Sequence, residues 1–222
     1  MWYIYLRINT FKHLSLKIYM KSLTKNITWW VFSFFCVIIG IYPLLYFFID
    51  RLFGLLGSKS PDLLSDTTWN IAFYGHIVLG GLALLIGWLQ FSKKLRNKHI
   101  IWHRRIGIIY VISVLISGLC SVYLGFHATG GLVSKIGFIS LGLVWLSTTA
   151  LAFKAIKNGN ITKHQNFMIY SYAACFAAVM LRIWLPLLTI SLGDFIPAYR
   201  VVAWLCWVPN MLVAYFIVKR KN

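Results

Sequence analysis

Three residues with ionisable or metal-ligating side chains stand in or beside long apolar stretches of this 222-residue chain. His76 and Arg182 lie within such stretches, and His127 directly follows one. If the stretches cross a bilayer, all three residues fall near the same membrane face. Polar side chains at membrane depth are costly and usually functional. An imidazole can ligate haem iron, and a guanidinium can bind a haem propionate, a carboxylate or a phosphate.

A second set of histidines precedes the apolar stretches near the opposite face. His103 and His164 each stand just before such a stretch, and His99 lies four residues before His103, a helical spacing that can chelate a metal. A solvated basic loop in contact with lipid is the competing interpretation of this set. If haem is bound, His76 with His127 would hold an outer group, and His103 with His164 an inner one.

Six apolar stretches position these residues. Each is about 20 residues long, which is the length that a helix needs to cross about 30 Å of hydrocarbon. Only 12% of the residues are charged and the mean hydropathy is +0.76. We predict an all-α membrane protein whose second to fifth helices form a four-helix bundle. The predicted spans are Ile27–Ile49, Asn70–Phe91, Ile106–Phe126, Ile136–Phe153, Phe167–Ile190 and Val201–Val218.

We expect one transmembrane domain over residues 27–222, with residues 70–190 as its core. Residues 1–26 form a basic segment with two open interpretations. The segment either lies on the inner leaflet as an amphipathic element, or it includes a gene-start artefact, with Met20 rather than Met1 as the natural start.

The net charge of +18 is distributed asymmetrically between the spans. Lys and Arg concentrate in the N-terminal segment, in the loops after the second and fourth spans and in the C-terminal tail, whereas the alternate loops hold all four Asp. Positive loops stay in the cytoplasm. We therefore expect both termini inside, in a bacterial cytoplasmic membrane, with anionic lipids at the cytoplasmic face. Nearly all of the Lys and Arg residues lie between the apolar stretches, which argues against nucleic-acid binding.

Two helical faces carry the candidate residues. His76, Gly80, Ala83 and Gly87 share one face. The small residues there permit either the approach of a flat haem or quinone ring, or simply close packing of two helices. His164 and Arg182 are eighteen residues apart, which is five turns, so we expect both on one face of a single fifth helix.

The motifs resemble an uncharacterised bacterial integral-membrane family, domain of unknown function 2306, over about residues 70–190. This chain has Gln165 after His164, where the resemblance leads us to expect an arginine, so this position is less suited to binding an anion. The resemblance implies a membrane protein but no activity. The arrangement of histidines also resembles, more loosely, the two-haem b-type transmembrane cytochromes. The motifs that carry the family resemblance are His76-x-x-x-Gly80, His103-Arg104-Arg105-Ile106-Gly107-Ile108-Ile109-Tyr110 and His164-Gln165-Asn166-Phe167-Met168-Ile169-Tyr170-Ser171-Tyr172-Ala173, with Arg182 after them.

Three functions from different classes follow. The first is a haem b- or quinone-dependent electron-transfer protein with a membrane redox partner, in which Arg182 neutralises a propionate or a quinone oxygen. The second is a transporter or binder of a small anionic or lipid-like molecule, with Arg182 as its anchor and His76 as a proton-linked partner. Such a protein is expected to contain discontinuous helices. The third is a non-catalytic membrane assembly protein whose small-residue faces pack against another subunit.

Overall fold

The computed structural model describes residues 26–48 and 54–221, which form helices and turns without any strand. Six helices are long and apolar enough to cross a membrane, which confirms the predicted all-α architecture. Most extend by a turn or more beyond the predicted ends, because helices continue through the flanking polar residues. The N-terminal segment falls almost entirely outside the described residues. The candidate spans are Asn26–Phe47, Thr67–Phe91, Ile100–Phe126, Leu132–Lys157, Ile161–Leu192 and Phe195–Lys221.

The chain divides after Phe35 into two compact units. In the first, residues 26–35 are helical, and Ser33 Oγ donates a hydrogen bond of 2.8 Å to the carbonyl of Trp29. The second unit continues in helical conformation through residue 41 and ends this span as the 3-10 helix η1 (Tyr42–Phe47), with Pro43 near its start. Pro43 lacks a backbone donor, which accounts for the change of helix type there.

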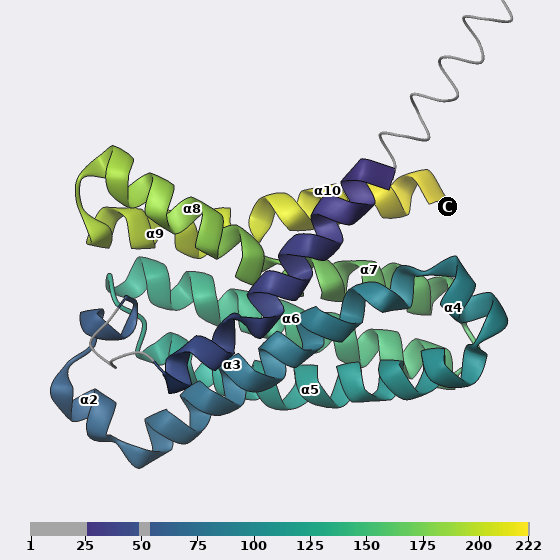
Figure 1. Ribbon diagram of the computed structural model, residues 1–222, viewed down its shortest axis with the longest axis horizontal. Helices are drawn as coiled ribbons and strands as arrows, with labels where there is room; N and C mark the ends of the chain where they lie inside the picture. Colours follow the sequence, from purple (N-terminus) through teal and green to yellow (C-terminus); the bar gives the residue numbers. More distant parts are fainter. Residues whose placement is uncertain (1–25, 49–53, 222) are drawn as a thin grey trace, which may run out of the picture. The chain divides into compact units, whose positions relative to one another are not determined.

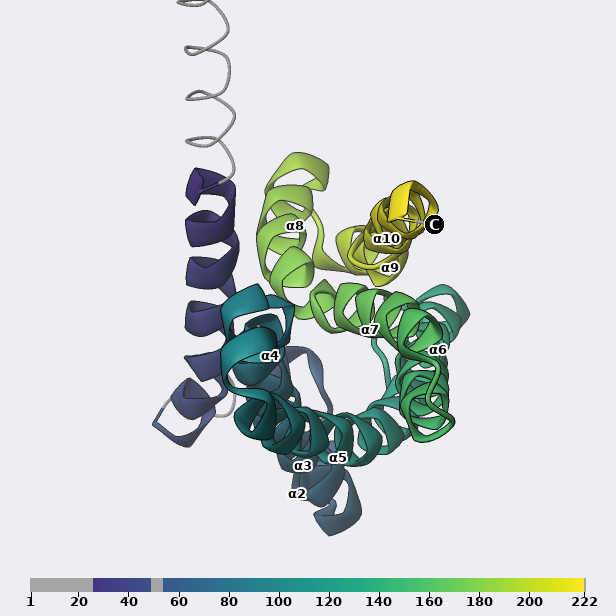
Figure 2. The same ribbon diagram turned by 90° about the vertical axis from the view of Figure 1, so that its right-hand side faces the viewer.

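The core of the second unit is a four-helix bundle. It consists of α3 (Thr67–Gly87), α5 (Ile100–Phe126), α6 (Leu132–Lys157) and α7 (Ile161–Cys175). Successive helices pack against each other in chain order, as Figures 1 and 2 show. Close packing depends on glycine at several crossings: a Cβ on Gly118 would lie 2.6 Å from a methyl group of Leu146. The predicted bundle is therefore present, although only the first half of the fifth span belongs to it.

The fifth and sixth spans are both discontinuous. The fifth consists of α7 and α8 (Ala177–Leu192), separated by Phe176, and α8 packs mainly against α9 (Phe195–Leu205). The sixth continues from α9 into α10 (Val208–Lys221) through a two-residue turn. Figure 2 shows α8 leaving the bundle where α7 ends. The expectation of one straight helix placing His164 and Arg182 on a common face is therefore wrong.

One side chain joins the two breaks. The Asn210 amide nitrogen donates to the carbonyl of Ala173 at 3.3 Å and to that of Cys206 at 3.0 Å. Carbonyls released where a helix is interrupted need such partners, because an unpaired buried carbonyl is costly. Asn210 thus stabilises the interruption of both spans at the same level.

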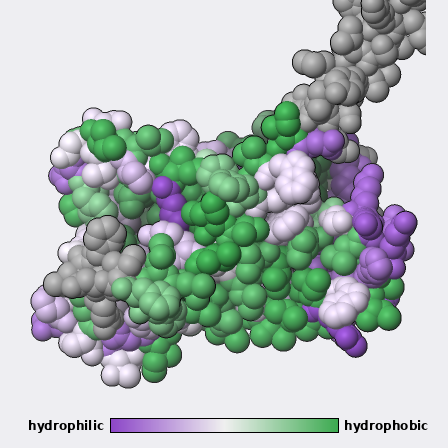
Figure 3. Space-filling view, in the orientation of Figure 1, coloured by the Kyte–Doolittle hydropathy of each residue, from purple (hydrophilic) through white to green (hydrophobic). Residues whose placement is uncertain are grey.

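The two ends of the bundle differ in charge. The basic end holds the start of α5, the end of α10, and α4 (Lys93–Lys98), which follows the 3-10 helix η3 (Trp88–Phe91). The aspartate end holds α2 (Pro61–Ser65), the 3-10 helix η2 (Leu56–Ser58) and the turn after α8, with Asp62, Asp66 and Asp194. Figure 3 shows hydrophilic surface at the end where α4 lies and hydrophobic surface along the helices. The basic loops therefore gather at one end, as the charge pattern predicts.

Candidate functional site

A cavity of about 230 Å³ lies between the helices in the half of the second unit nearer the aspartate end. Its walls come from η1, α3, α5, α6, α8, α9 and the segment around η2, and from the end of α7, where the fifth span is interrupted. Along α3 it extends from Trp69 to Leu84, which is about 22 Å of helix. The cavity is therefore elongated along α3. Most lining side chains are apolar.

His76 of α3 lines the cavity, and its hydrogen bonds define which ring nitrogen carries a proton. Its Nδ1 lies 3.1 Å from the carbonyl oxygen of Ser117 and 3.0 Å from the Ser117 hydroxyl. That hydroxyl donates to the carbonyl of His76 at 2.9 Å, and a carbonyl can only accept. Nδ1 is therefore the protonated nitrogen. Nε2 has no hydrogen-bond partner among the described residues, and in the neutral ring it is an acceptor.

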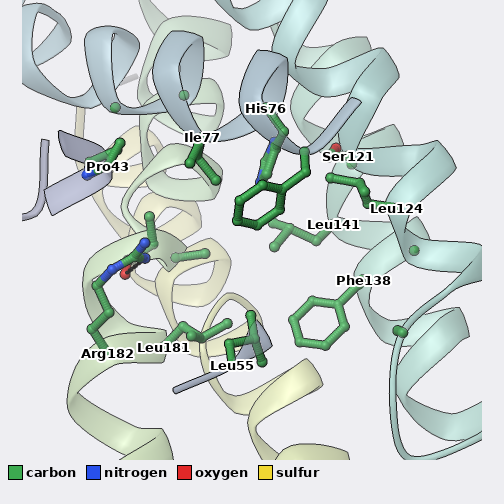
Figure 4. A pocket seen from close by; sticks show the side chains of 18 of the residues that line it. Pro43, Leu55, His76, Ile77, Ser121, Leu124, Phe138, Leu141, Leu181 and Arg182 are labelled. Carbon is green, nitrogen blue, oxygen red and sulfur yellow. Dashed lines mark hydrogen bonds between the residues drawn. The ribbon is translucent and has the colours of Figure 1, made fainter. Parts of the chain in front are cut away.

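Arg182 approaches the same cavity from α8, as Figure 4 shows, with His76 on the opposite wall. Its Nη1 donates to the carbonyl of Ala178 at 2.9 Å, and its Cζ lies 4.5 Å from the ring centroid of Tyr42. Its Nε is buried and has no hydrogen-bond partner within the described part of the chain. The carboxylates whose positions are described belong to the aspartate end, and none lines the cavity. Arg182 is thus a buried cation without a countercharge among these residues.

Lys59, which follows η2, adds a second cation to the cavity wall. Its ammonium donates to the carbonyl of His127 at 2.7 Å and to the hydroxyl of Thr129 at 2.9 Å. Burial, reinforced by the nearby Lys135, lowers the pKa of Lys59 to about 8. Lys59 therefore binds the turn between α5 and α6 through these hydrogen bonds. Its ammonium group loses its charge at a lower pH than that of an ordinary exposed lysine.

The expected outer pair of histidines does not meet in this cavity. His127 ends α5, and its ring packs on Tyr123 with the centroids 5.1 Å apart. His127 is not among the residues that line the cavity. The structure brings together two of the three outer residues predicted from the sequence, His76 and Arg182. The third, His127, takes part only through its backbone carbonyl, which accepts a hydrogen bond from Lys59.

The inner histidines are neighbours at the basic end. His103 lies in the first turn of α5 and His164 in the first turn of α7, close enough to interact electrostatically. Nδ1 of His164 donates to the carbonyl of Ala152 at 2.9 Å, whereas Nδ1 of His103 is buried without a partner in the described chain. In the parts of the chain that are described, no three His, Cys, Asp or Glu side chains cluster as metal ligands would.

The small-residue face of α3 serves mainly for helix packing. A Cβ on Gly87 would collide with the rings of Tyr110 and Tyr172, and Ala83 is completely buried. A Cβ on Gly80 would lie 3.0 Å from the hydroxyl oxygen of Ser117. Gly80 also lines the cavity. Side chains of the protein itself therefore occupy most of this groove along α3. Of the two alternatives predicted from the sequence, helix packing accounts for more of the face than a bound haem or quinone ring.

These features define a polytopic α-helical membrane protein with an elongated, largely apolar cavity that two cations line. Residues 73–218 match the family described as "Predicted membrane protein (DUF2306)", which is more than half of the chain. The chain belongs to this family, as its motifs indicate, and the match also includes the sixth span. No curated protein and no solved structure matches the chain.

Proposed function

We propose that this protein binds, and carries through the membrane, an amphipathic molecule with an anionic head group. The cavity would hold the head group between Arg182 and Lys59, with the chain of the molecule along the apolar wall of α3. The observation that carries the proposal is Arg182, a buried guanidinium that faces an apolar cavity with no carboxylate among its described lining residues.

The charge of the site favours an anion. An uncompensated buried charge is strongly unfavourable, and a partner removes most of that cost. Arg182 and Lys59 both line the cavity, so an anionic ligand would supply the missing countercharge for two cations. One guanidinium nitrogen already serves Ala178, which leaves the remaining donors for the ligand. Arginine offers a planar set of donors that matches carboxylate and phosphate oxygens.

The shape of the site favours a chain over a broad ring system. The cavity is elongated, and its volume is below the roughly 300–1,000 Å³ typical of pockets that enclose a drug-sized ligand. An amphipathic ligand would therefore be held in part and would extend from the cavity into the lipid. The cavity holds one of the candidate haem-ligating histidines, His76. This arrangement supports the lipid-like ligand better than a haem bound by two histidines.

The discontinuous spans support a carrier in particular. Interrupted helices at membrane depth are tolerated where they are buried or line a cavity, and many transporters bind their substrates at such breaks. Here Ala174, Cys175, Ala177 and Ala178 on both sides of the α7–α8 break line the cavity that contains Arg182. With the basic end in the cytoplasm, as the charge pattern predicts, the cavity would lie nearer the outer leaflet.

The test is a ligand-binding assay in phosphatidylcholine nanodiscs. We expect laurate and dodecyl phosphate to raise the melting temperature, and dodecanol and dodecylamine to have little effect. Saturation at about 100 times Kd corresponds to about 2.7 kcal/mol of stabilisation. Arg182→Gln should abolish the effect of the anions, whereas Arg104→Gln, which removes an exposed arginine at the basic end, should preserve it.

Equal stabilisation by dodecanol and laurate, or equal losses in the two arginine variants, would contradict an anion site at Arg182. Uptake of a fluorescent long-chain anion into proteoliposomes tests the carrier step separately, and binding without uptake would limit the function to a binding protein. An absorption spectrum of the same preparation, oxidised and reduced, tests the haem alternative.

A further inference from the structure

We infer that the head group of the ligand carries a hydroxyl donor as well as a negative charge, and that a phosphate monoester on a lipid chain is the class that fits. This inference rests on the proposed function, since it concerns the same cavity. It adds a second recognition element, His76, which distinguishes among anions that Arg182 alone would bind equally.

The recognition element follows from the hydrogen bonds of the His76 ring. Nδ1 donates to the Ser117 carbonyl at 3.1 Å, and the Ser117 hydroxyl is committed to the backbone of His76. The ring orientation and the proton position are thus both determined by α5. A second proton on the ring is disfavoured, because it would place another charge near Arg182 in an apolar cavity. Nε2 therefore presents a lone pair that only a donor can satisfy.

The two walls of the cavity consequently make opposite demands. Arg182 and Lys59 offer donors and positive charge, whereas Nε2 of His76 offers an acceptor. A carboxylate has only acceptor oxygens and would leave Nε2 unpaired. A phosphate monoester in its monoanionic form has a P–OH group beside anionic oxygens, and its second pKa is about 6. One head group of this class can therefore donate to His76 and accept from Arg182 on the facing wall.

The experiment compares two ligands of equal charge. Near pH 5, where about nine-tenths of the monoester is the monoanion, dodecyl phosphate and its methyl diester both carry about one negative charge. Only the monoester has a P–OH group. We expect the wild-type protein in phosphatidylcholine nanodiscs to bind the monoester at least about tenfold more tightly, the equivalent of about 1.4 kcal/mol.

The variants assign the difference to one side chain. His76→Phe should lower the affinity for the monoester to that for the diester and leave the diester unchanged, whereas Arg182→Gln should weaken both. Equal wild-type affinities for the two esters would overturn the donor requirement even if the Arg182 effect remains. Absence of binding by every anion would instead refute the proposed function. Inorganic phosphate should not stabilise the protein, and stabilisation by it would show that the head group alone is the ligand.

Discussion

Arg182→Met separates a role in stability from a role in binding. The substitution keeps an unbranched side chain of similar length and removes the charge, the Nη1 bond to Ala178 and the contact with Tyr42. We expect the variant to fold with nearly unchanged stability and to lose its affinity for long-chain anions. The combination is informative because most buried residues lose stability and function together when they are replaced.

Opposing contributions lead to the small expected change in stability. The lost hydrogen bond involves a charged donor, worth about 1.5–3 kcal/mol, and the cation–π contact about 0.5–2 kcal/mol. Against these losses, the variant no longer desolvates an unpaired guanidinium, a cost of several kcal/mol. The net change should remain below the about 2–5 kcal/mol of a core Leu→Ala substitution. One lost charge-assisted hydrogen bond to the ligand corresponds to about a 10- to 150-fold loss of affinity.

The assay measures thermal unfolding in nanodiscs with and without dodecyl phosphate, for the wild type, Arg182→Met and the matched exposed variant Arg104→Met. Arg182→Lys retains the charge without the planar set of donors, so it should recover part of the affinity. A variant that unfolds readily yet still binds the anion normally would refute the reasoning, because Arg182 would then be a structural residue.

Three further predictions concern other parts of the structure. Lys59 is charged only below about pH 8, so the wild-type affinity for a permanently charged anion such as an alkyl sulfonate should fall as the pH rises through that value, and Lys59→Met should lose this dependence. Asn210→Leu leaves two carbonyls unpaired, at about 1–3 kcal/mol each, which should appear as a clear drop in melting temperature. Gly87→Ala forces a collision with Tyr172 and should cost about 1–3 kcal/mol, more than Gly75→Ala, whose Cβ would have its nearest contact at 3.3 Å.

The sequence predicts the six spans because the free energy of membrane insertion depends on local composition. Runs of about 20 apolar residues and the charge between them are sufficient for that prediction. The breaks in the fifth and sixth spans could not be predicted in the same way. Phe176 stands among alanines with no proline or glycine beside it, and the partner that accommodates the break, Asn210, is in another span. Pro209 alone indicates the break in the sixth span.

The candidate site was predictable only in part for a similar reason. A histidine and an arginine in apolar stretches stand out from the sequence, and both line the cavity. Lys59 does not stand out, because a single cation in a polar turn looks like any solvated loop residue. Its role depends on its contact with the turn between α5 and α6, about seventy residues away. The tautomer of His76 likewise depends on Ser117 of another helix.

The location of Arg182 links the broken spans to the proposed ligand. Had α7 continued without a break, five turns would have aligned Arg182 with His164 along the bundle. The break at Phe176 turns α8 towards α9 instead, and Arg182, less than two turns later, reaches the cavity from the wall opposite His76. Asn210 donates hydrogen bonds to a carbonyl at each break, so interrupting the helices leaves few backbone groups unpaired. The interrupted helix therefore has a consequence that an intact one would lack: a guanidinium and an imidazole acceptor on facing walls of one apolar cavity.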